Sequence, residues 1–527
     1  MIKEYFWVAA IGILLNATLI IVDAAGFLPL NPGLFGLTFL IVFLLALYRP
    51  IWIFWLFIIS LPLESVIISS PSIPLSFRPF QVIGLMLFLA TASLIFYDRS
   101  KNNKSWSELI KFNKDKFLSV GDVAVLVLCG LSFVSLFKSL NFGVTLKQNF
   151  VLLFFVMLYF LSKFYLRKKQ NQFEALWFFV ATSLPILIFG IYQSLAFKVG
   201  WLDFQVFAER ANGTFTEPDW FGIYLVFLGA IIYWLKLQMF RTKNSTMIAQ
   251  WELRKVGQWV ANFYLLLIFV VLILTVARSA WVGFLALTIV YFIILIWQKI
   301  ILKLRNFNLE NYFRETLTIG SIYFSAIILV ILFGLSNFNL TNRAASSVSG
   351  LQEITISCPA GIEAPAEISG VEELDNYGCK HINLEDINGE IISGNNIQKV
   401  LRPDPNVEIR KNIYQTTWKE IKNNFWIGQG LGSSSEVLGT DSYGHGLNAS
   451  NIFLEVWFSW GFLGLIVFAF LLLCPGFTAL RNFSSKSSKL GLSFFVVLTM
   501  TALIIPNLFN AGIFLSLFWV WLALINS

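Results

Sequence analysis

Long apolar runs dominate the chain from Phe6 to Ile525, and short polar or charged segments separate them. A helix needs roughly 20 mostly apolar residues to cross a membrane, and the runs predict about 14 such spans, or about 12 if two weak early runs only re-enter the membrane. The predicted spans lie near 6–23, 34–48, 51–65, 80–97, 121–138, 148–166, 174–194, 220–238, 257–277, 280–297, 316–335, 451–474, 490–506 and 510–525. We therefore expect an all-α, polytopic transmembrane helical bundle.

The composition agrees with this pattern, because 57% hydrophobic and only 13% charged residues exceed what a soluble core can bury. If the spans alternate in direction, most Lys and Arg residues of the connecting segments fall on one side, which the positive-inside rule assigns to the cytoplasm. This bias explains the formal net charge of +8, so we do not expect nucleic acid as a partner. Both termini are then cytoplasmic.

One long polar segment, residues 336–450, falls on the outer side and divides the chain. Residues 1–335 are expected to form transmembrane helices 1 to 11 with short loops, and residues 451–527 the C-terminal transmembrane helices. Within the outer segment, an acidic part rich in Ser, Gly and Asn covers 344–400. That part could select an acceptor or bind a partner, but its composition favours a solvated surface decoration.

The outer segment contains two cysteines, Cys358 and Cys379, whereas Cys129 and Cys474 lie within predicted spans. A disulfide between Cys358 and Cys379 fits an oxidising compartment, and two free thiols are the alternative.

The second part of the outer segment, from Asp404, predicts an amphipathic helix on the outer membrane surface. Asp404-Pro405 is a typical helix start, and apolar residues follow at helical spacing as far as Phe425. The sequence "GQGLG" comes next and includes Gly428 and Gly430. This pattern favours a plain turn, although glycines of this kind could also cradle a phosphate.

Two arginines stand out because positive charge is scarce on the outer side. Arg210 lies in "ERANGTFTEPDWFG", a short outer loop, and Arg278 lies in "LTVARSAWVG", a tight outer hairpin between two spans. An arginine in such a place is costly unless it is paired or serves a site, and Arg278 also begins a helix whose dipole favours an anion. The alternative is an arginine that reaches towards lipid phosphates. The same alternative applies, with less supporting context, to Arg78, Lys138, Lys147 and Lys198.

Polar residues also gather at the start of a later span, in "GHGLNASNIFLEVWFSWGFLG". His445 has a suitable ordinary pKa for a general base, or it is a solvated loop histidine. Ser450 and Asn451 are expected to cap the helix rather than bind a ligand. The cluster predicts a pocket at the outer mouth of this span.

Glu455 lies about one helical turn inside the same span. It is a second candidate for the base. The alternative is a structural carboxylate that pairs with Arg278 or Arg210 and holds it in position.

In combination, these motifs resemble the O-antigen ligase and polymerase superfamily of bacterial envelopes. The resemblance covers roughly residues 80–525 and rests on the order and spacing of "RANGTF" with a following Pro, "ARSAWVG" between two spans, "WKEIKNNFWIGQGLGS", and "ASN" nine residues ahead of "GFLG". The order is specific, whereas each motif alone is weak.

The resemblance implies a glycan transfer from an undecaprenyl diphosphate-linked donor to a glycan or glycolipid acceptor, such as lipid A core, on the outer side of the bacterial inner membrane. It implies no metal and no cofactor, and it assigns diphosphate binding to Arg210 and Arg278. The family places a histidine directly before the Asn, Ser or Gln that precedes nine residues and Gly-x-x-Gly. Here Ser450 occupies that place, and His445 lies five residues earlier.

Three other functions are compatible with the sequence. A polysaccharide polymerase would use the same donor with a different acceptor. A secondary transporter of small anions or solutes would also need many spans, but the clear internal repeat that is typical of transporters is missing from the sequence. A non-catalytic scaffold for envelope assembly is a further alternative. The two histidines, His381 and His445, do not have the spacing of a zinc site.

Overall fold

The computed structural model describes residues 2–72, 76–102, 119–207, 210–241, 248–301, 309–335, 346, 349–382, 386–440, 446–483, 490–510 and 516–527. The chain divides into two compact units. The first, called here the helical unit, comprises Met1–Leu335 and Thr417–Ser527, and the second, the small unit, comprises Ser336–Thr416. The long polar segment is therefore split, because its residues from 417 onwards belong with the helical unit.

The helical unit consists of apolar helices. Their bounds are α1 Ile2–Ala24, α2 Pro32–Tyr48, α3 Pro50–Ser60, α4 Pro79–Asn102, α6 Val120–Val134, η1 Ser135–Lys138, α7 Phe142–Tyr165, α8 Lys169–Thr182, α9 Leu184–Val199, α10 Pro218–Arg241, α11 Ile248–Leu274, α12 Arg278–Ile301, α13 Leu309–Leu332, α17 Ser435–Leu438, α18 Ile452–Phe483, α19 Leu490–Asn507 and α20 Ser516–Asn526. A further helix, α16 Pro405–Asn423, spans the boundary between the units and confirms the helix predicted from Pro405.

Ten helical stretches in the described part of the chain are long and apolar enough to cross a membrane. Four shorter apolar helices, α2, α3, α20 and most of α19, accompany them. Together they coincide with the predicted apolar runs, so the prediction of an all-α polytopic membrane protein is confirmed. Many large apolar side chains on their outer faces are exposed, such as Leu37, Leu40 and Leu44 of α2. Such surfaces are rare on soluble proteins but suit contact with lipid.

The predicted span 174–194 lies within one candidate membrane span, Lys169–Val199, which consists of two consecutive helices. Its helix α8 ends at Thr182, and α9 begins at Leu184 with Pro185 in its first turn. Proline lacks the backbone N–H that would continue α8, but it fits the first turn of a new helix.

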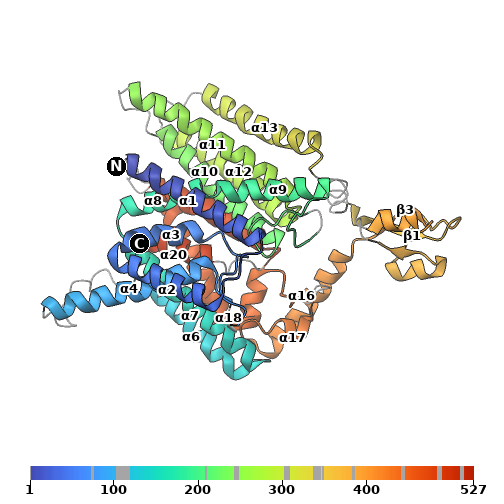
Figure 1. Cartoon of the computed structure of the whole chain (residues 1–527), viewed down its shortest axis with the longest axis horizontal. Helices are drawn as coiled ribbons and strands as arrows, with labels where there is room; N and C mark the ends of the chain where they lie inside the picture. The colour runs from blue at the N-terminus through green and yellow to red at the C-terminus, as the bar shows by residue number, and fades with distance from the viewer. Residues whose placement is uncertain are drawn as a thin grey trace. The chain divides into compact units, whose positions relative to one another are not determined.

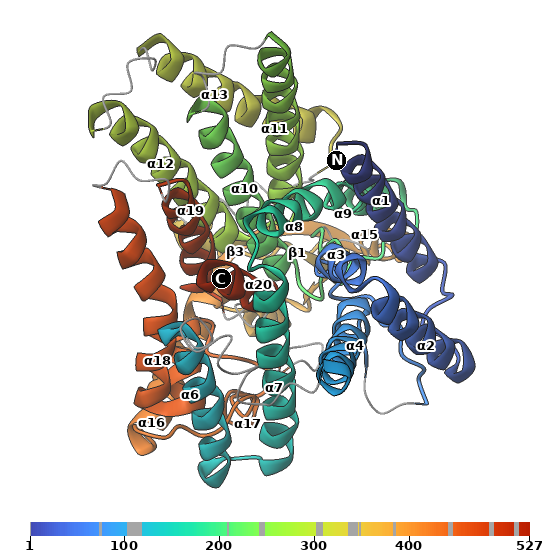
Figure 2. The ribbon, with the colours of Figure 1, turned by 90° about the vertical axis from the view of Figure 1, so that its left-hand side faces the viewer.

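Helix α10 is the most deeply buried of the long helices. It packs against α11, α12 and α19, and Figure 1 shows α10 to α13 side by side. In turn, α19 packs against α12 and α18, while α20 packs against α7 (Figure 2). Helices α19 and α20 therefore link α10 and α12 to α18 and α7, and large buried aromatic rings pack between them. The ring of Trp519, for example, stacks on that of Phe155 at a centroid distance of 6.2 Å.

The small unit contains a three-stranded antiparallel sheet that the sequence analysis did not predict. Its strands are β1 Leu351–Cys358, β2 Lys380–His381 and β3 Asn396–Pro403, in the spatial order β2-β1-β3. The helix η2 Val371–Tyr377 and the helix α15 Ile387–Ile392 complete it. A small core of Ile354, Ile356, Ile368, Leu374 and Val400 lies within the unit, so the acidic insert is a folded element.

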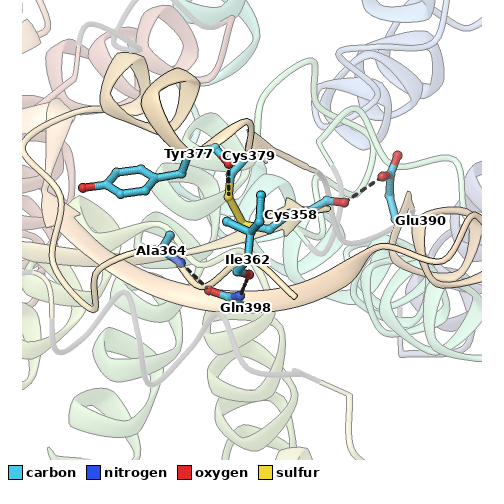
Figure 3. The surroundings of a disulfide bond; sticks show 8 residues. Cys358, Ile362, Ala364, Tyr377, Cys379, Glu390 and Gln398 are labelled. Carbon is cyan, nitrogen blue, oxygen red and sulfur yellow. Dashed lines mark hydrogen bonds between the residues drawn. A yellow bond between two sulfur atoms is a disulfide. The ribbon is translucent and has the colours of Figure 1, made fainter. Parts of the chain in front are cut away.

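The predicted disulfide between Cys358 and Cys379 is present, and both residues are buried (Figure 3). It joins the end of β1 to the residue before β2. Nearby, the pKa of Glu390 is lowered to about 2. The hydrogen bond from the Lys380 ammonium is the largest cause, and the hydrogen bonds from Ser357 and Asn395 add to it. Because this pKa is depressed by folding, the stabilisation is present above the carboxyl's usual pKa of about 4.3 and is lost as the pH falls towards 2.

Replacing both Cys358 and Cys379 with serine should destabilise the small unit by about 3 kcal/mol, because the bridge closes a loop with a sequence separation of 21. Limited proteolysis of the full-length protein in nanodiscs measures this effect as faster cleavage within residues 349–403. The control is Cys474→Ser, since Cys474 is a free thiol of the helical unit. Equal cleavage rates in the double variant and the control would contradict the prediction.

Candidate functional site

The structure brings the two predicted arginine motifs together. The backbone N–H of Ala211 donates to the carbonyl of Leu274 at 3.0 Å, and Nε of Arg210 donates to the carbonyl of Thr275 at 3.1 Å. Nη2 of Arg210 pairs with Asp219 in the first turn of α10 at 3.2 Å. Only 15% of the Arg210 side chain is exposed, and the guanidinium is held by Asp219 of α10 and by Thr275 in the turn after α11.

The "RANGTF" loop that carries Arg210 is itself braced from α9. Oε1 of Gln193 accepts hydrogen bonds from the backbone N–H groups of Asn212 and Gly213, and Nδ2 of Asn212 donates to the carbonyl of Phe215. Gly213 has a φ of 55°, and a Cβ there would lie 2.7 Å from the ring of Phe221. The glycine is therefore required for this close approach.

Arg278 is the first residue of α12 and is half-buried. A tight turn places it there, because Oγ1 of Thr275 accepts from the N–H of Ala277, and Nε1 of Trp281 donates to the carbonyl of Leu272. The N-terminal end of a helix carries a partial positive charge, which adds to the charge of the guanidinium. The two arginines thus lie in adjacent, hydrogen-bonded segments at one end of the helical unit, called here the arginine end.

A third cation reaches the same loop through a carboxylate that the sequence analysis did not single out. Oε1 of Glu64 pairs with Nη2 of Arg78 at 2.8 Å. Oε2 of Glu64 accepts from the backbone N–H and the hydroxyl of Thr216, each at 3.2 Å. Glu64 is buried, and its backbone N–H donates to the carbonyl of Thr214. The loop that carries Arg210 is therefore held by Gln193 and by Glu64. The only sequence signal for Glu64 was an acidic residue directly after an apolar run.

The remaining cations of the prediction lie in different surroundings. Lys138 and Lys147 are exposed, and Nζ of Lys198 donates to the carbonyl of Phe333 at 2.6 Å. The structure does not bring these three lysines into hydrogen bonds with the arginine motifs in the part of the chain it describes.

Asn451 caps α18, as predicted. Its Oδ1 accepts from the backbone N–H groups of Phe453 and Leu454, and its Nδ2 donates to the carbonyl of Leu508. Ser450 has a left-handed backbone conformation. It has a φ of 48°, and its backbone N–H donates to Oδ1 of Asn448. The cap therefore ties the start of α18 to the end of α19.

Glu455 is buried one turn into α18. Its Oε2 accepts from the backbone N–H of Ala449 at 2.8 Å, and its Oε1 accepts from the hydroxyl of Ser459 at 3.5 Å. Among the described residues no ion pair joins Glu455 to either arginine, and Arg210 pairs with Asp219 instead. The carboxylate thus holds the residues that precede α18. His445 lies outside the described residues.

The "GQGLG" turn packs against a break in α18. Gly461 has a φ of 69° and interrupts the helix, which leaves carbonyls without their helical partners. The N–H groups of Gln429 and Gly430 donate to the carbonyls of Phe458 and Ser459, at 2.8 and 3.1 Å. On the other side of the break, the N–H of Phe462 donates to the carbonyl of Phe425 at 2.8 Å.

Two glycines make this approach possible. A Cβ on Gly461 would lie 2.2 Å from the carbonyl oxygen of Trp426, and one on Gly428 would lie 2.5 Å from the nitrogen of Gly461. Gly428 and Gly430 both have positive φ values, at 79° and 95°. The glycine turn therefore pairs with the backbone of α18, and the N–H groups of Gln429 and Gly430 are not free to cradle a phosphate.

The end of α19 connects these parts. Leu508 accepts the hydrogen bond from Asn451 at the start of α18, while Pro506 lies so close to α12 that a Cβ on Gly283 would be 2.5 Å from its Cγ. Gly283 is little more than one turn from Arg278. The capped start of α18, with Glu455, therefore lies at the arginine end of the helical unit.

His, Cys, Asp and Glu side chains do not form groups of three or more that could hold a metal ion, as far as the described residues show. Arg210, Arg278 and the helix start at Arg278 are instead suited to an anionic group.

Residues 263–469 match the family model described as O-antigen ligase. The match includes the Arg278 turn, the small unit, the glycine turn and the break in α18. No curated protein matches the chain. Ten helices that could cross a membrane identify the chain as a polytopic membrane protein, and the match over residues 263–469 supports its relation to the O-antigen ligase superfamily.

Proposed function

We propose that the chain is a glycosyltransferase of the bacterial inner membrane that resembles an O-antigen ligase. It transfers a glycan from an undecaprenyl diphosphate-linked donor to a glycan or glycolipid acceptor on the outer side of the membrane. The observation that carries this proposal is the hydrogen-bonded contact between the Arg210 and Arg278 motifs. Arg210 and Thr275, which form one of these hydrogen bonds, are 65 positions apart in the sequence.

The chemistry of such a donor suits the arginine end. The acceptor oxygen forms a bond to the anomeric carbon while the bond from that carbon to the diphosphate oxygen breaks, and negative charge grows on the leaving diphosphate. Guanidinium groups that are already oriented stabilise this charge without reorganisation, and Arg210 is oriented by Thr275 and Asp219. The start of α12 adds its dipole at Arg278.

The acceptor hydroxyl must also lose its proton, and we assign His445 as the general base because its ordinary pKa is close to neutral. A positioned base contributes typically 10²–10⁴-fold to the rate. Glu455 is the second candidate. Its two oxygens already accept hydrogen bonds from Ala449 and Ser459, which favours a role in holding the segment after His445.

The distribution of charge supports the proposed orientation. Arg99 and Lys101 lie near the end of α4, Lys169 lies at the start of α8, and Arg481 lies near the end of α18. These helix termini lie opposite to the arginine end. The positive-inside rule places these basic termini in the cytoplasm. The arginine end then faces the periplasm, and both chain termini are cytoplasmic.

The break in α18 is a feature that transporters also use, because discontinuous helices often bind substrates through their freed backbone groups. Here the carbonyls of Phe458 and Ser459 at the break are bonded to the glycine turn. Those two groups cannot bind a substrate unless the turn leaves, so transport is the weaker alternative.

The test uses purified protein in lipid nanodiscs, an undecaprenyl diphosphate-linked oligosaccharide and two acceptors supplied separately. With lipid A core, a ligase should release undecaprenyl diphosphate and form a glycosylated core. With a second lipid-linked repeat as acceptor, a polymerase should form a longer lipid-linked glycan. Absence of release with every acceptor, together with movement of solute across the membrane of proteoliposomes, would replace the enzyme proposal by transport.

A further inference from the structure

A second site lies at the end of the helical unit remote from Arg210. A cavity of about 580 Å³ opens there between the start of α8, the end of α10, the last turns of α18, and parts of α19 and α20. Helix α10 begins near Arg210 and reaches this cavity at Gln238, which is roughly 30 Å further along the helix. The cavity is therefore separate from the arginine end. Its volume is typical of sites for small molecules, which occupy about 300–1,000 Å³.

The lining changes from polar to apolar along the axis of α18. Lys169, Gln172 and Asn482 lie at the helix termini, and Phe470 and Leu471 lie at the opposite end of the cavity. The distance along α18 from Asn482 to Phe470 is about 18 Å. This depth is close to one half of the hydrocarbon core of a membrane, about 15 Å. The cavity thus has the polarity and depth of a site for one lipid chain in a single leaflet.

Small residues create the space. The lining includes Gly121, Cys474, Ala479, Gly491 and Ser493, whose side chains leave room between the larger rings. One wall is fixed, because Nε1 of Trp234 donates to the carbonyl of Gly491 at 2.8 Å. The cavity therefore lies within the packing of α10 against α19, and the backbone at Gly491 helps to set its shape.

The charge at the mouth indicates the headgroup. Among the described residues, those that line the cavity include one cation, Lys169, and no acidic residue. Arg167 and Lys168 precede Lys169 and are exposed, as is Arg481 beside Asn482. Positive charge near a membrane surface attracts anionic lipids. We propose that the cavity binds one anionic phospholipid, with an acyl chain between α8, α18 and α19 and the phosphate at Lys169.

Native mass spectrometry of the full-length protein tests this site. Delipidated protein is titrated with phosphatidylglycerol or with phosphatidylcholine of the same acyl chains. One phosphatidylglycerol should bind more tightly than phosphatidylcholine, and Lys169→Gln should weaken that binding about fivefold, the effect expected for one lysine near a membrane surface. The matched control is Lys101→Gln, which removes an exposed lysine near the end of α4.

A second variant tests the chain rather than the headgroup. Ala479→Phe should fill the apolar wall and prevent binding of the phospholipid, while thermal unfolding and size exclusion verify that this variant is folded. Equal affinity for the two lipids, equal effects of Lys169→Gln and Lys101→Gln, or unchanged binding by folded Ala479→Phe would each overturn the proposal. So would displacement of the lipid by inorganic phosphate, because the acyl chain would then contribute nothing.

Discussion

Arg278→Ala and Arg210→Ala should each lower the release of undecaprenyl diphosphate by about 100-fold or more. Each substitution removes a cation that stabilises charge as it develops on the leaving group, and the loss of one such preoriented donor typically costs 10²–10³-fold in rate. Arg210 adds a geometric element, because its guanidinium is already fixed by Asp219 and Thr275. The measurement is the initial rate of release in nanodiscs that contain the donor and a competent acceptor.

The matched control for both arginine variants is Lys147→Ala. Lys147 is exposed and lies in the first turns of α7, where Thr145 and Gln148 approach the glycine turn. Its removal changes the net charge by the same amount and should leave release unchanged. Normal release by both arginine variants would eliminate the proposed diphosphate site, while an equal loss in the Lys147 variant would indicate a general effect of charge.

Gly461→Ala should destabilise the protein by about 3 kcal/mol or more. A non-glycine residue at positive φ costs roughly 1–2 kcal/mol, and backbone strain of this kind reaches about 3 kcal/mol. The new Cβ would also lie 2.2 Å from the carbonyl oxygen of Trp426, so the glycine turn would have to move away. Thermal unfolding of the purified protein and the yield of folded protein from membranes measure the effect.

Gly320→Ala provides the comparison. Gly320 lies within α13, its φ is not positive, and a Cβ there would meet nothing within 4 Å. Alanine is the better helix former by about 1 kcal/mol, so this variant should be at least as stable as the wild type. A Gly461 variant as stable as the Gly320 variant would show that the break in α18 does not depend on the glycine.

The spans could be predicted from the sequence because a membrane helix depends on one local property, a long apolar run. Features that depend on partners elsewhere in the chain could not. The sheet of the small unit rests on pairing between β1 and β3, about 45 residues apart, and the acidic composition around these strands gave no signal of it. The division at Ser183 was also missed, although Pro185 marks it.

The candidate site shows the same limit. Arg210 and Arg278 were predicted because a cation next to apolar spans is costly, and this argument needs no structure. Glu64 was missed because its role depends on Thr216, which is 152 residues away in the sequence. The glycine turn was correctly placed, but its function as the partner of a helix break follows only from the contact between Gly428 and Gly461.

The glycine turn has a consequence for the exchange of parts between related proteins. The polar segment ends near residue 450 in the sequence, which suggests that a chimera could replace it as one piece up to α18. The compact small unit ends at Thr416, however, and Phe425, Gln429 and Gly430 are hydrogen-bonded to the backbone of α18. A graft should therefore end near 416 and preserve the helical register of α16, because a junction at 450 would separate two halves of one interlocked element.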